Sequence, residues 1–86
     1  MNFQYHKNFC KQILKLPIAK QQLCQNRIQL FWTYQNHPLL NRHALSGKYT
    51  NYFSLNVGGD LRVVYKQVGT DTIEFVTVGT HSQLDK

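Results

Sequence analysis

Polar residues that could act on a phosphodiester are concentrated in the second half of the chain. They are His43, Lys48, Asn56, Asp60, Arg62, Lys66 and His81. A histidine titrates near neutral pH and can take up or give a proton, an arginine makes paired hydrogen bonds to phosphate oxygens, and a carboxylate can orient or charge a neighbouring imidazole. Such a set suits RNA cleavage without a metal ion. A base would take the ribose 2′-hydroxyl proton, an acid would protonate the 5′-oxygen leaving group, and a cation would offset the charge on the phosphate.

Each of these side chains also has an ordinary structural explanation. A single histidine in a loop is more often a plain surface residue than a catalytic one. Arg62 stands between two apolar residues and could simply face solvent. Asp60 follows a Gly-Gly pair, where an aspartate suits a turn, and the two lysines suit solvated basic positions. The residues alone therefore leave two interpretations open, an RNA-compatible site or an ordinary basic surface.

Other chemistries find less support in the sequence. No pair of carboxylates is placed for glycoside hydrolysis, no glycine-rich phosphate loop precedes a helix, and no HExxH motif occurs. Cys10 and Cys24 fall in predicted helices without a histidine or cysteine at metal-ligand spacing. We expect both thiols to be small buried hydrophobic groups. We therefore expect neither a metal ion nor a small-molecule cofactor.

The charge balance favours a polyanionic partner. Ten Lys and Arg residues stand against four Asp and Glu residues, which gives a formal net charge of +6. Such a surplus attracts nucleic acid, and the attraction grows with the number of phosphates neutralised. Lys7, Lys11 and Lys15 would share one face of a helix. The same charge would also suit an ordinary soluble surface or an acidic protein partner, so charge alone leaves these alternatives open.

Length and hydropathy predict a single small domain, residues 1–86. The hydrophobic share of 42% is enough for one core, although a chain of this size buries little more than half of its unfolded surface. No apolar run approaches the roughly 20 residues that span a bilayer. The first fifteen residues contain no apolar stretch typical of a signal peptide. We therefore expect a cytoplasmic protein without membrane contact.

Apolar periodicity predicts an α+β fold. The expected elements are a strand at 2–6, helices at 6–16 and 18–35, a loop at 36–47, and strands at 49–57, 60–68 and 72–78. Pro17 separates the helices, the Gly-Gly pair at 58–59 forms a two-residue hairpin turn, and Gly79 breaks the last strand. Helices joined by so short a break should form a hairpin that covers one face of a mainly antiparallel sheet.

Period-two alternation assigns side chains to the two faces of this sheet. Phe53, Leu55 and Val57 point one way along their strand, so they should pack under the helices. The face that the helices leave open would then carry the polar residues Ser54, Asn56 and Arg62. This open face is where we expect RNA to bind.

Four short motifs follow one another in this half of the chain. They are RHALSG at 42–47, YFSLNV at 52–57, DLRVVYK at 60–66 and VGTHSQL at 78–84. In order and spacing they closely resemble the RelE/ParE toxin superfamily, and most of all its YafQ-like branch; each motif alone is weak, but four in register are specific. The resemblance implies the small RelE-like fold of β-α-α-β-β-β order. It also implies a toxin of a type II toxin–antitoxin module, which cleaves mRNA in the ribosomal A site and is held inactive by a cognate antitoxin.

The resemblance further implies roles for individual residues. His43 and His81 match the acid/base positions of YafQ-like toxins. Asp60 matches a further active-site position, where it would orient or charge a histidine. Arg62 matches the arginine that RelE-type relatives place on the phosphate. These four residues are the catalytic set that the sequence predicts.

The chain departs from the YafQ-like pattern at three positions. Asn56 stands where those toxins carry a histidine, Leu61 where they carry a tryptophan, and Asp85 where an aromatic residue occurs near the C-terminus. Asparagine can hydrogen-bond a phosphate or a ribose but does not transfer protons at neutral pH. We therefore expect Asn56, together with Lys48 and Lys66, to bind substrate, whereas acid/base catalysis falls to the two motif histidines.

Two rival functions stay open at this point. A ParE-like protein would inhibit DNA gyrase without catalysis, although the two motif histidines argue against that function. A degenerate toxin would only bind its antitoxin, which the departures at Asn56 and Leu61 allow. Cleavage of mRNA on translating ribosomes would separate an endoribonuclease from both rivals.

Overall fold

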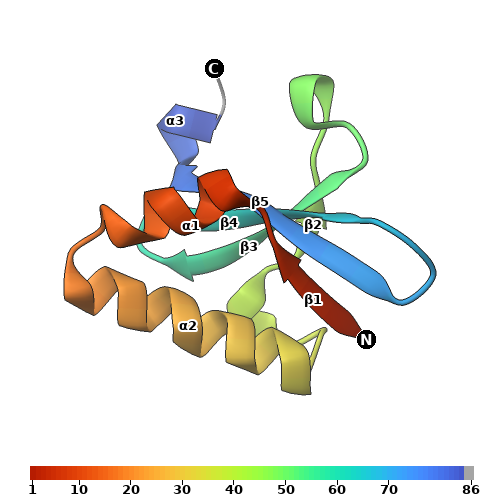
Figure 1. The fold of residues 1–86 in the computed structure, drawn as a ribbon, viewed down its shortest axis with the longest axis horizontal. Coiled ribbons are helices and arrows are strands. Elements are labelled where there is room, and N and C mark those ends of the chain that lie inside the picture. Colours follow the sequence, from red (N-terminus) through yellow and green to blue (C-terminus); the bar gives the residue numbers. More distant parts are fainter. Residues whose placement is uncertain (85–86) are drawn as a thin grey trace.

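The strands of residues 1–84, which the computed structural model describes, form one mixed sheet (Figure 1). The strands are β1 (Asn2–Tyr5), β2 (His43–Ala44), β3 (Tyr52–Gly58), β4 (Leu61–Gln67) and β5 (Thr72–Thr80). The helices are α1 (Lys7–Leu14), α2 (Ile18–Thr33) and the short α3 (His81–Leu84), with 3₁₀ turns η1 (Pro38–Leu40) and η2 (Gly47–Tyr49). The strand order is β1-β5-β4-β3-β2; β1 is parallel to β5, and the other neighbours are antiparallel. The α+β fold expected from the sequence is confirmed; Asp85 lies outside the described residues.

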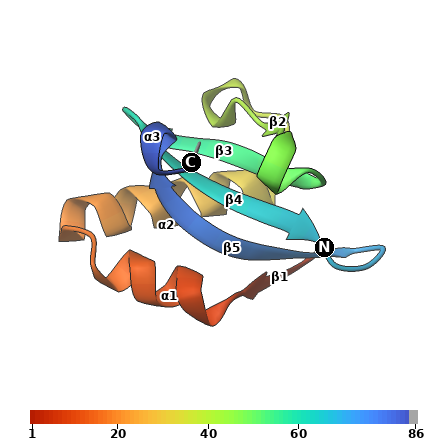
Figure 2. The ribbon, with the colours of Figure 1, turned by 90° about the horizontal axis from the view of Figure 1, so that it is seen from above.

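The two long helices cover one face of the sheet. Figure 2 shows α2 behind the strands and α1 alongside β5. Phe9 of α1 and Phe31 of α2 both contact Phe75 of β5, with ring centroids 5.7 and 6.5 Å apart. Such aromatic pairs add about 0.5–1.5 kcal/mol beyond the area that they bury. The opposite face carries α3 and the segment from β2 to β3, which both rise from the sheet on the side away from α2 (Figure 1).

The alternation of side chains along β3 and β4 is confirmed. Leu55 and Val57 are fully buried in the hydrophobic cluster that also includes residues from both long helices, and the half-buried Phe53 packs against this cluster. Asn56 and Arg62 are partners across β3 and β4, so they share the opposite face. The predicted open face therefore exists, and it is the face from which α3 and the β2–β3 segment rise.

Several boundaries differ from the sequence prediction. Residues 36–47 are not all loop, because His43 and Ala44 pair with β3 as strand β2. The strand expected from Tyr49 begins only at Tyr52, since residues 47–49 form η2 and Asn51 takes a left-handed conformation with φ of 74°. The 58–59 turn is also displaced by one residue: Gly58 still pairs within the sheet, and Gly59 supplies the positive φ of 55°.

Gly79 does not break the last strand as predicted. It pairs with Arg62 inside the sheet, and β5 continues to Thr80. A Cβ at this position would lie 3.0 Å from Oε1 of Gln83. The glycine therefore leaves room for α3 to fold back against the end of β5.

The cysteine prediction is right for one thiol and wrong for the other. Cys24 is buried, and burial raises the pKa of its thiol. Cys10 is exposed, because it does not lie on the side of α1 that faces the core, which is the side that carries the buried Phe9. Within residues 1–84 no helix is long and apolar enough to cross a membrane.

Gln12 of α1 completes the hydrogen bonding of β5 beyond the end of β1. The β4–β5 register shifts between Thr77 and Phe75, and β1 pairs no further than Phe75. The Oε1 atom of Gln12 accepts hydrogen bonds from the Val78 N–H at 3.0 Å and from the Thr77 hydroxyl at 3.1 Å. The side chain thus supports the part of β5 that leads into α3.

We expect Gln12→Leu to lower the free energy of unfolding by about 1–3 kcal/mol, because it leaves a part-buried N–H without an acceptor. Gln12→Glu keeps the acceptor oxygen and should cost clearly less. Urea denaturation, monitored by circular dichroism, measures the free energy of unfolding of both variants. Equal stability of the leucine variant and the wild type would contradict this role for Gln12.

Candidate functional site

A cleft of about 570 Å³ opens on the face of the sheet away from α2. Its lining includes four of the residues predicted from the sequence, His43, Lys48, Arg62 and His81. They come from β2, η2, β4 and α3, which are distant in the sequence. The rest of the lining is Ala44, Leu45, Ser46, Gly47, Tyr49, Ser54 and Leu84. The cleft therefore joins two imidazoles and two cationic side chains around one space.

His81 is positioned by the junction between β5 and α3. Its backbone N–H donates to the carbonyl oxygen of Asp60 at 3.1 Å, which ties it to the β3–β4 turn. Thr80 and Gln83 form reciprocal bonds: the Gln83 N–H donates to the Thr80 hydroxyl oxygen at 3.2 Å, and the Thr80 N–H donates to Gln83 Oε1 at 2.8 Å. This is a capping box, which fixes the first turn of a helix. Its sequence signature, Thr80-x-x-Gln83, is the local signal for a helix that begins at His81.

His43 is held by both of its ring nitrogens. Nδ1 lies 2.9 Å from the carbonyl oxygen of Asn41, and Nε2 lies 3.2 Å from Oγ of Ser54. A carbonyl can only accept, so Nδ1 carries the hydrogen and donates it. In the neutral ring, Nε2 then accepts from the Ser54 hydroxyl. The Ser54 residue is only 1% exposed. The sequence places it on the open face of the sheet but does not reveal its contact with His43, because that contact depends on the pairing of the two residues across β2 and β3.

Arg62 contributes a guanidinium group with unused hydrogen-bonding capacity. Its Nε is buried, as is Oδ1 of its cross-strand partner Asn56, and neither atom has a hydrogen-bond partner in the part of the chain that the structure describes. No ion pair of Arg62 occurs within residues 1–84. A buried polar group without a partner costs about 1–3 kcal/mol. An anion in the cleft would be a favourable partner for this cation.

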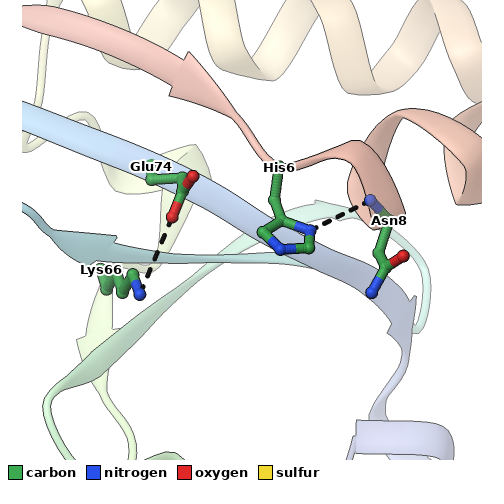
Figure 3. A network of polar contacts seen from close by, with 4 residues as sticks. All are labelled: His6, Asn8, Lys66 and Glu74. Atoms are coloured by element: carbon green, nitrogen blue, oxygen red, sulfur yellow. Dashed lines mark hydrogen bonds and ion pairs between the residues drawn. The ribbon is translucent and has the colours of Figure 1, made fainter.

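Three predicted site residues lie outside the lining of the cleft. Asp60 is exposed in the β3–β4 turn, where its carbonyl accepts from His81. Asn56 faces Arg62 across the strands. Lys66 lies four residues along β4 from Arg62, with Nζ 3.8 Å from the carboxylate of Glu74 (Figure 3). The structure thus brings four of the seven predicted residues together and places these three around them.

The other two histidines have structural positions. The Nδ1 atom of His6 accepts from the Asn8 N–H at 3.1 Å and caps α1, as Figure 3 shows. The Nδ1 atom of His37 accepts from the Leu39 N–H at 3.1 Å and caps η1 in the same way. Among residues 1–84, no group of three or more His, Cys, Asp or Glu side chains is placed to hold a metal ion.

A second, larger groove of about 790 Å³ runs between α1 and α2. Its lining combines apolar side chains with glutamines, and it includes no histidine, lysine or arginine of the described residues. Size alone would favour this groove as the site. Acid/base chemistry on a phosphodiester needs titratable and cationic groups, so the smaller cleft is the candidate.

Comparison with known proteins identifies the family and the fold. The family model described as "Bacterial toxin of type II toxin-antitoxin system, YafQ" matches residues 1–86. No curated protein matches the chain by sequence. The crystal structure of YafQ from E. coli strain BL21(DE3) is similar, with a TM-score of 0.75, 19% identity, and coverage of 99% of this chain and 98% of that chain.

Two further solved structures have the same fold. The YoeB/ParE toxin from Agrobacterium tumefaciens matches with a TM-score of 0.76 at 15% identity, over 94% of this chain and 99% of that chain. The E. coli DinJ-YafQ toxin-antitoxin complex matches with a TM-score of 0.73 at 22% identity, over 99% of this chain and 97% of that chain. These structures establish the fold, and the family model extends over the whole sequence. The chain therefore belongs to the YafQ family of bacterial toxins of type II toxin–antitoxin systems.

Proposed function

We propose that this toxin is a ribosome-dependent endoribonuclease that cleaves mRNA during translation and is neutralised by a cognate antitoxin. The observation that carries the proposal is the cleft that gathers His43, His81, Arg62 and Lys48. Membership of the YafQ toxin family supports the proposal, as does the similar fold of the toxin in the E. coli DinJ-YafQ toxin-antitoxin complex. The cytoplasm is the compartment that this function requires, because translating ribosomes are found there.

The hydrogen bonds of His43 favour it as the general base. Its Nδ1 hydrogen is committed to the Asn41 carbonyl, so Nε2 is the nitrogen that can take up a proton. The 2′-hydroxyl of the substrate would donate to Nε2, and the Ser54 hydroxyl would turn so that its oxygen stabilises the positive charge that the ring gains. The 2′-oxygen then attacks phosphorus as its proton passes to His43. The bond from phosphorus to the 5′-oxygen breaks, and His81 donates a proton to the leaving oxygen.

This reaction is balanced without water or a metal ion. It yields a 2′,3′-cyclic phosphate on one fragment and a 5′-hydroxyl on the other. Arg62 would hold the non-bridging phosphate oxygens as negative charge builds on them, with Lys48 adding positive charge from η2. The buried Nε of Arg62 would gain its missing partner in the same step or from an associated water.

The residues outside the cleft have supporting roles in this proposal. The backbone carbonyl of Asp60 fixes the backbone of His81. The Asp60 carboxylate lies in the same turn, where its negative charge would favour a protonated histidine. Asn56 would contact the substrate or bridge it to Arg62. Lys7 and Lys11 on α1 and Lys15, which caps its C-terminal end, are exposed, and they would contact ribosomal RNA at the A site.

Ser54 should act on catalysis through His43. We expect Ser54→Ala to slow mRNA cleavage about tenfold, the value of one hydrogen bond of about 1–1.5 kcal/mol. We expect His43→Ala to slow it about a hundredfold or more. The double variant should be no slower than His43→Ala alone, because the two residues act as one unit.

The measurement is the single-turnover rate of cleavage on ribosome-bound mRNA. Thr33→Ala is the matched control, since it removes a hydroxyl that bonds a backbone carbonyl on α2, outside the lining of the cleft. Losses that add in the double variant would contradict the coupling of Ser54 to His43.

A reconstituted translation reaction tests the proposed function itself. Purified toxin should cut labelled mRNA on translating ribosomes and leave naked mRNA largely intact, with the fragment ends described above. Supercoiling by purified DNA gyrase should be unaffected. Gyrase inhibition without mRNA cleavage would instead establish the ParE-like function, and inactivity in both reactions would indicate a toxin that only binds its antitoxin.

A further inference from the structure

A row of lysine and tyrosine side chains leads out of the cleft along the β2–β3 segment and onto the sheet. We name this row, Lys48, Tyr49, Tyr52 and Lys66, the tyrosine ledge. The ring centroids of Tyr49 and Tyr52 are 5.6 Å apart, with an angle of 77° between the rings. Nζ of Lys48 lies 5.5 Å from the Tyr49 centroid, and Nζ of Lys66 lies 5.9 Å from the Tyr52 centroid. Because Lys48 and Tyr49 also line the cleft, the row is continuous with it.

The two tyrosines of the ledge do not belong to the core. The aromatic residues of the core, among them Phe9 and Phe31 of the long helices and Phe75 of β5, pack between the helices and the sheet. Tyr49 and Tyr52 are half-buried and are not part of that cluster. Their rings therefore combine a supported position with accessible area, and each ring has a lysine ammonium within cation–π distance.

Aromatic rings between cationic groups fit unpaired nucleotides. Bases stack on aromatic side chains, and lysines neutralise the phosphates on either side. An acidic peptide would use the lysines but has no aromatic base to stack on the rings. We propose that the tyrosine ledge binds single-stranded RNA next to the cut, with one base on the tyrosines and the neighbouring phosphates on Lys48 and Lys66. This proposal rests on the proposed function, because the cleft at one end of the ledge is where the phosphodiester would be cut.

Glu74 sets the far end of the ledge. Its carboxylate pairs with Lys66 at 3.8 Å (Figure 3), so it offsets part of the lysine charge and would repel a phosphate beyond that point. The RNA track therefore extends from the cleft as far as Tyr52 and Lys66. Lys48, which has no ion pair within residues 1–84, should contribute more to RNA binding than Lys66.

The test measures binding of RNA that cannot be cut. Fully 2′-O-methylated hexanucleotides, labelled with fluorescein, are titrated with the His81→Ala toxin and followed by fluorescence anisotropy. In this background Tyr49→Leu and Tyr52→Leu should each weaken binding about tenfold, the effect of losing one base–aromatic stack. Tyr49→Phe and Tyr52→Phe keep the ring and should bind within about twofold of the parent. Tyr34→Leu, which changes an exposed tyrosine after α2, should have no effect.

Abasic substitutions locate the nucleotide on the ledge. Hexanucleotides with a single abasic residue are tested at each position against the parent and the leucine variants. At one position the loss of the base and the loss of the tyrosine should not add, because both remove the same stack. Circular dichroism confirms that each variant is folded.

Unchanged RNA affinity in both leucine variants would overturn the ledge as an RNA site. So would a loss of affinity for duplex RNA of the same length equal to the loss for single-stranded RNA. An equal loss of affinity for poly-L-glutamate would also overturn it and would indicate an acidic protein partner. Because the ligand is not cleaved and the toxin lacks His81, the outcome does not depend on catalysis. If the toxin fails to cut mRNA but the tyrosine effects persist, the proposed function fails and RNA binding at the ledge stands.

Discussion

Replacing His81 with alanine is expected to slow mRNA cleavage by about a hundredfold to ten-thousandfold, the range that a general acid contributes. The residue lies at the first turn of α3, where the capping box and the Asp60 carbonyl fix its backbone. His81 lines the cleft together with His43 and Arg62. Without it, the 5′-oxygen must leave unprotonated or take its proton from water. The cleavage rate on ribosome-bound mRNA measures the loss directly, and growth inhibition on induction should disappear with it.

The control for His81→Ala is His37→Ala. His37 caps η1 and lies outside the cleft, so its loss should cost some stability, about 1 kcal/mol for a lost cap, but little activity. The account of His81 would be wrong if His81→Ala and the wild type cut mRNA at the same rate. It would also be wrong if the two histidine variants lost activity equally.

Arg62→Ala should lower the cleavage rate by about a hundredfold to a thousandfold, the usual loss when one group that stabilises transition-state charge is removed. Arg62→Lys should recover little of this loss, because an ammonium group cannot reproduce the paired hydrogen bonds of a guanidinium to phosphate oxygens. Stability should respond differently from activity. Nε of Arg62 is buried without a hydrogen-bond partner among residues 1–84, so its removal should leave the free energy of unfolding unchanged or higher.

Both quantities are measured on the same preparation, by single-turnover cleavage and by urea denaturation. Arg27→Gln is the matched control, because Arg27 lies on α2 and bonds only the neighbouring Asn26 among the described residues. Full activity of Arg62→Ala would remove this residue from the mechanism. A loss of activity that follows a loss of stability would show that Arg62 serves the fold instead.

The local parts of the fold could be predicted because they depend on local patterns. Apolar alternation placed Leu55 and Val57 under the helices, and the same alternation placed Arg62 on the opposite face. The boundaries at Tyr49 and Gly79 are wrong for different reasons. Tyr49 belongs to the local 3₁₀ turn η2, which the apolar alternation does not distinguish from a strand, whereas Gly79 stays in β5 because it pairs with the distant Arg62.

The residue types that line the candidate cleft could be predicted from the sequence, whereas their geometry could not. His43 and Ser54 are eleven residues apart, and only the β2–β3 register brings the imidazole to the hydroxyl. Nothing in the composition of residues 36–47 indicates that two of them form a strand. The capping box at Thr80 and Gln83 is a different case, because its sequence signature was present and would have predicted a helix beginning at His81.

Mapping the 5′ ends of mRNA after induction of the toxin shows whether this protein cuts mRNA. An endoribonuclease should produce new ends inside translated codons, each with a 5′-hydroxyl and an upstream partner with a 2′,3′-cyclic phosphate. These ends should be absent after induction of His81→Ala or Arg62→Ala at equal protein level. Growth arrest by the wild type without new mRNA ends, or with gyrase-dependent DNA breaks in their place, would contradict the claim that this toxin cuts mRNA.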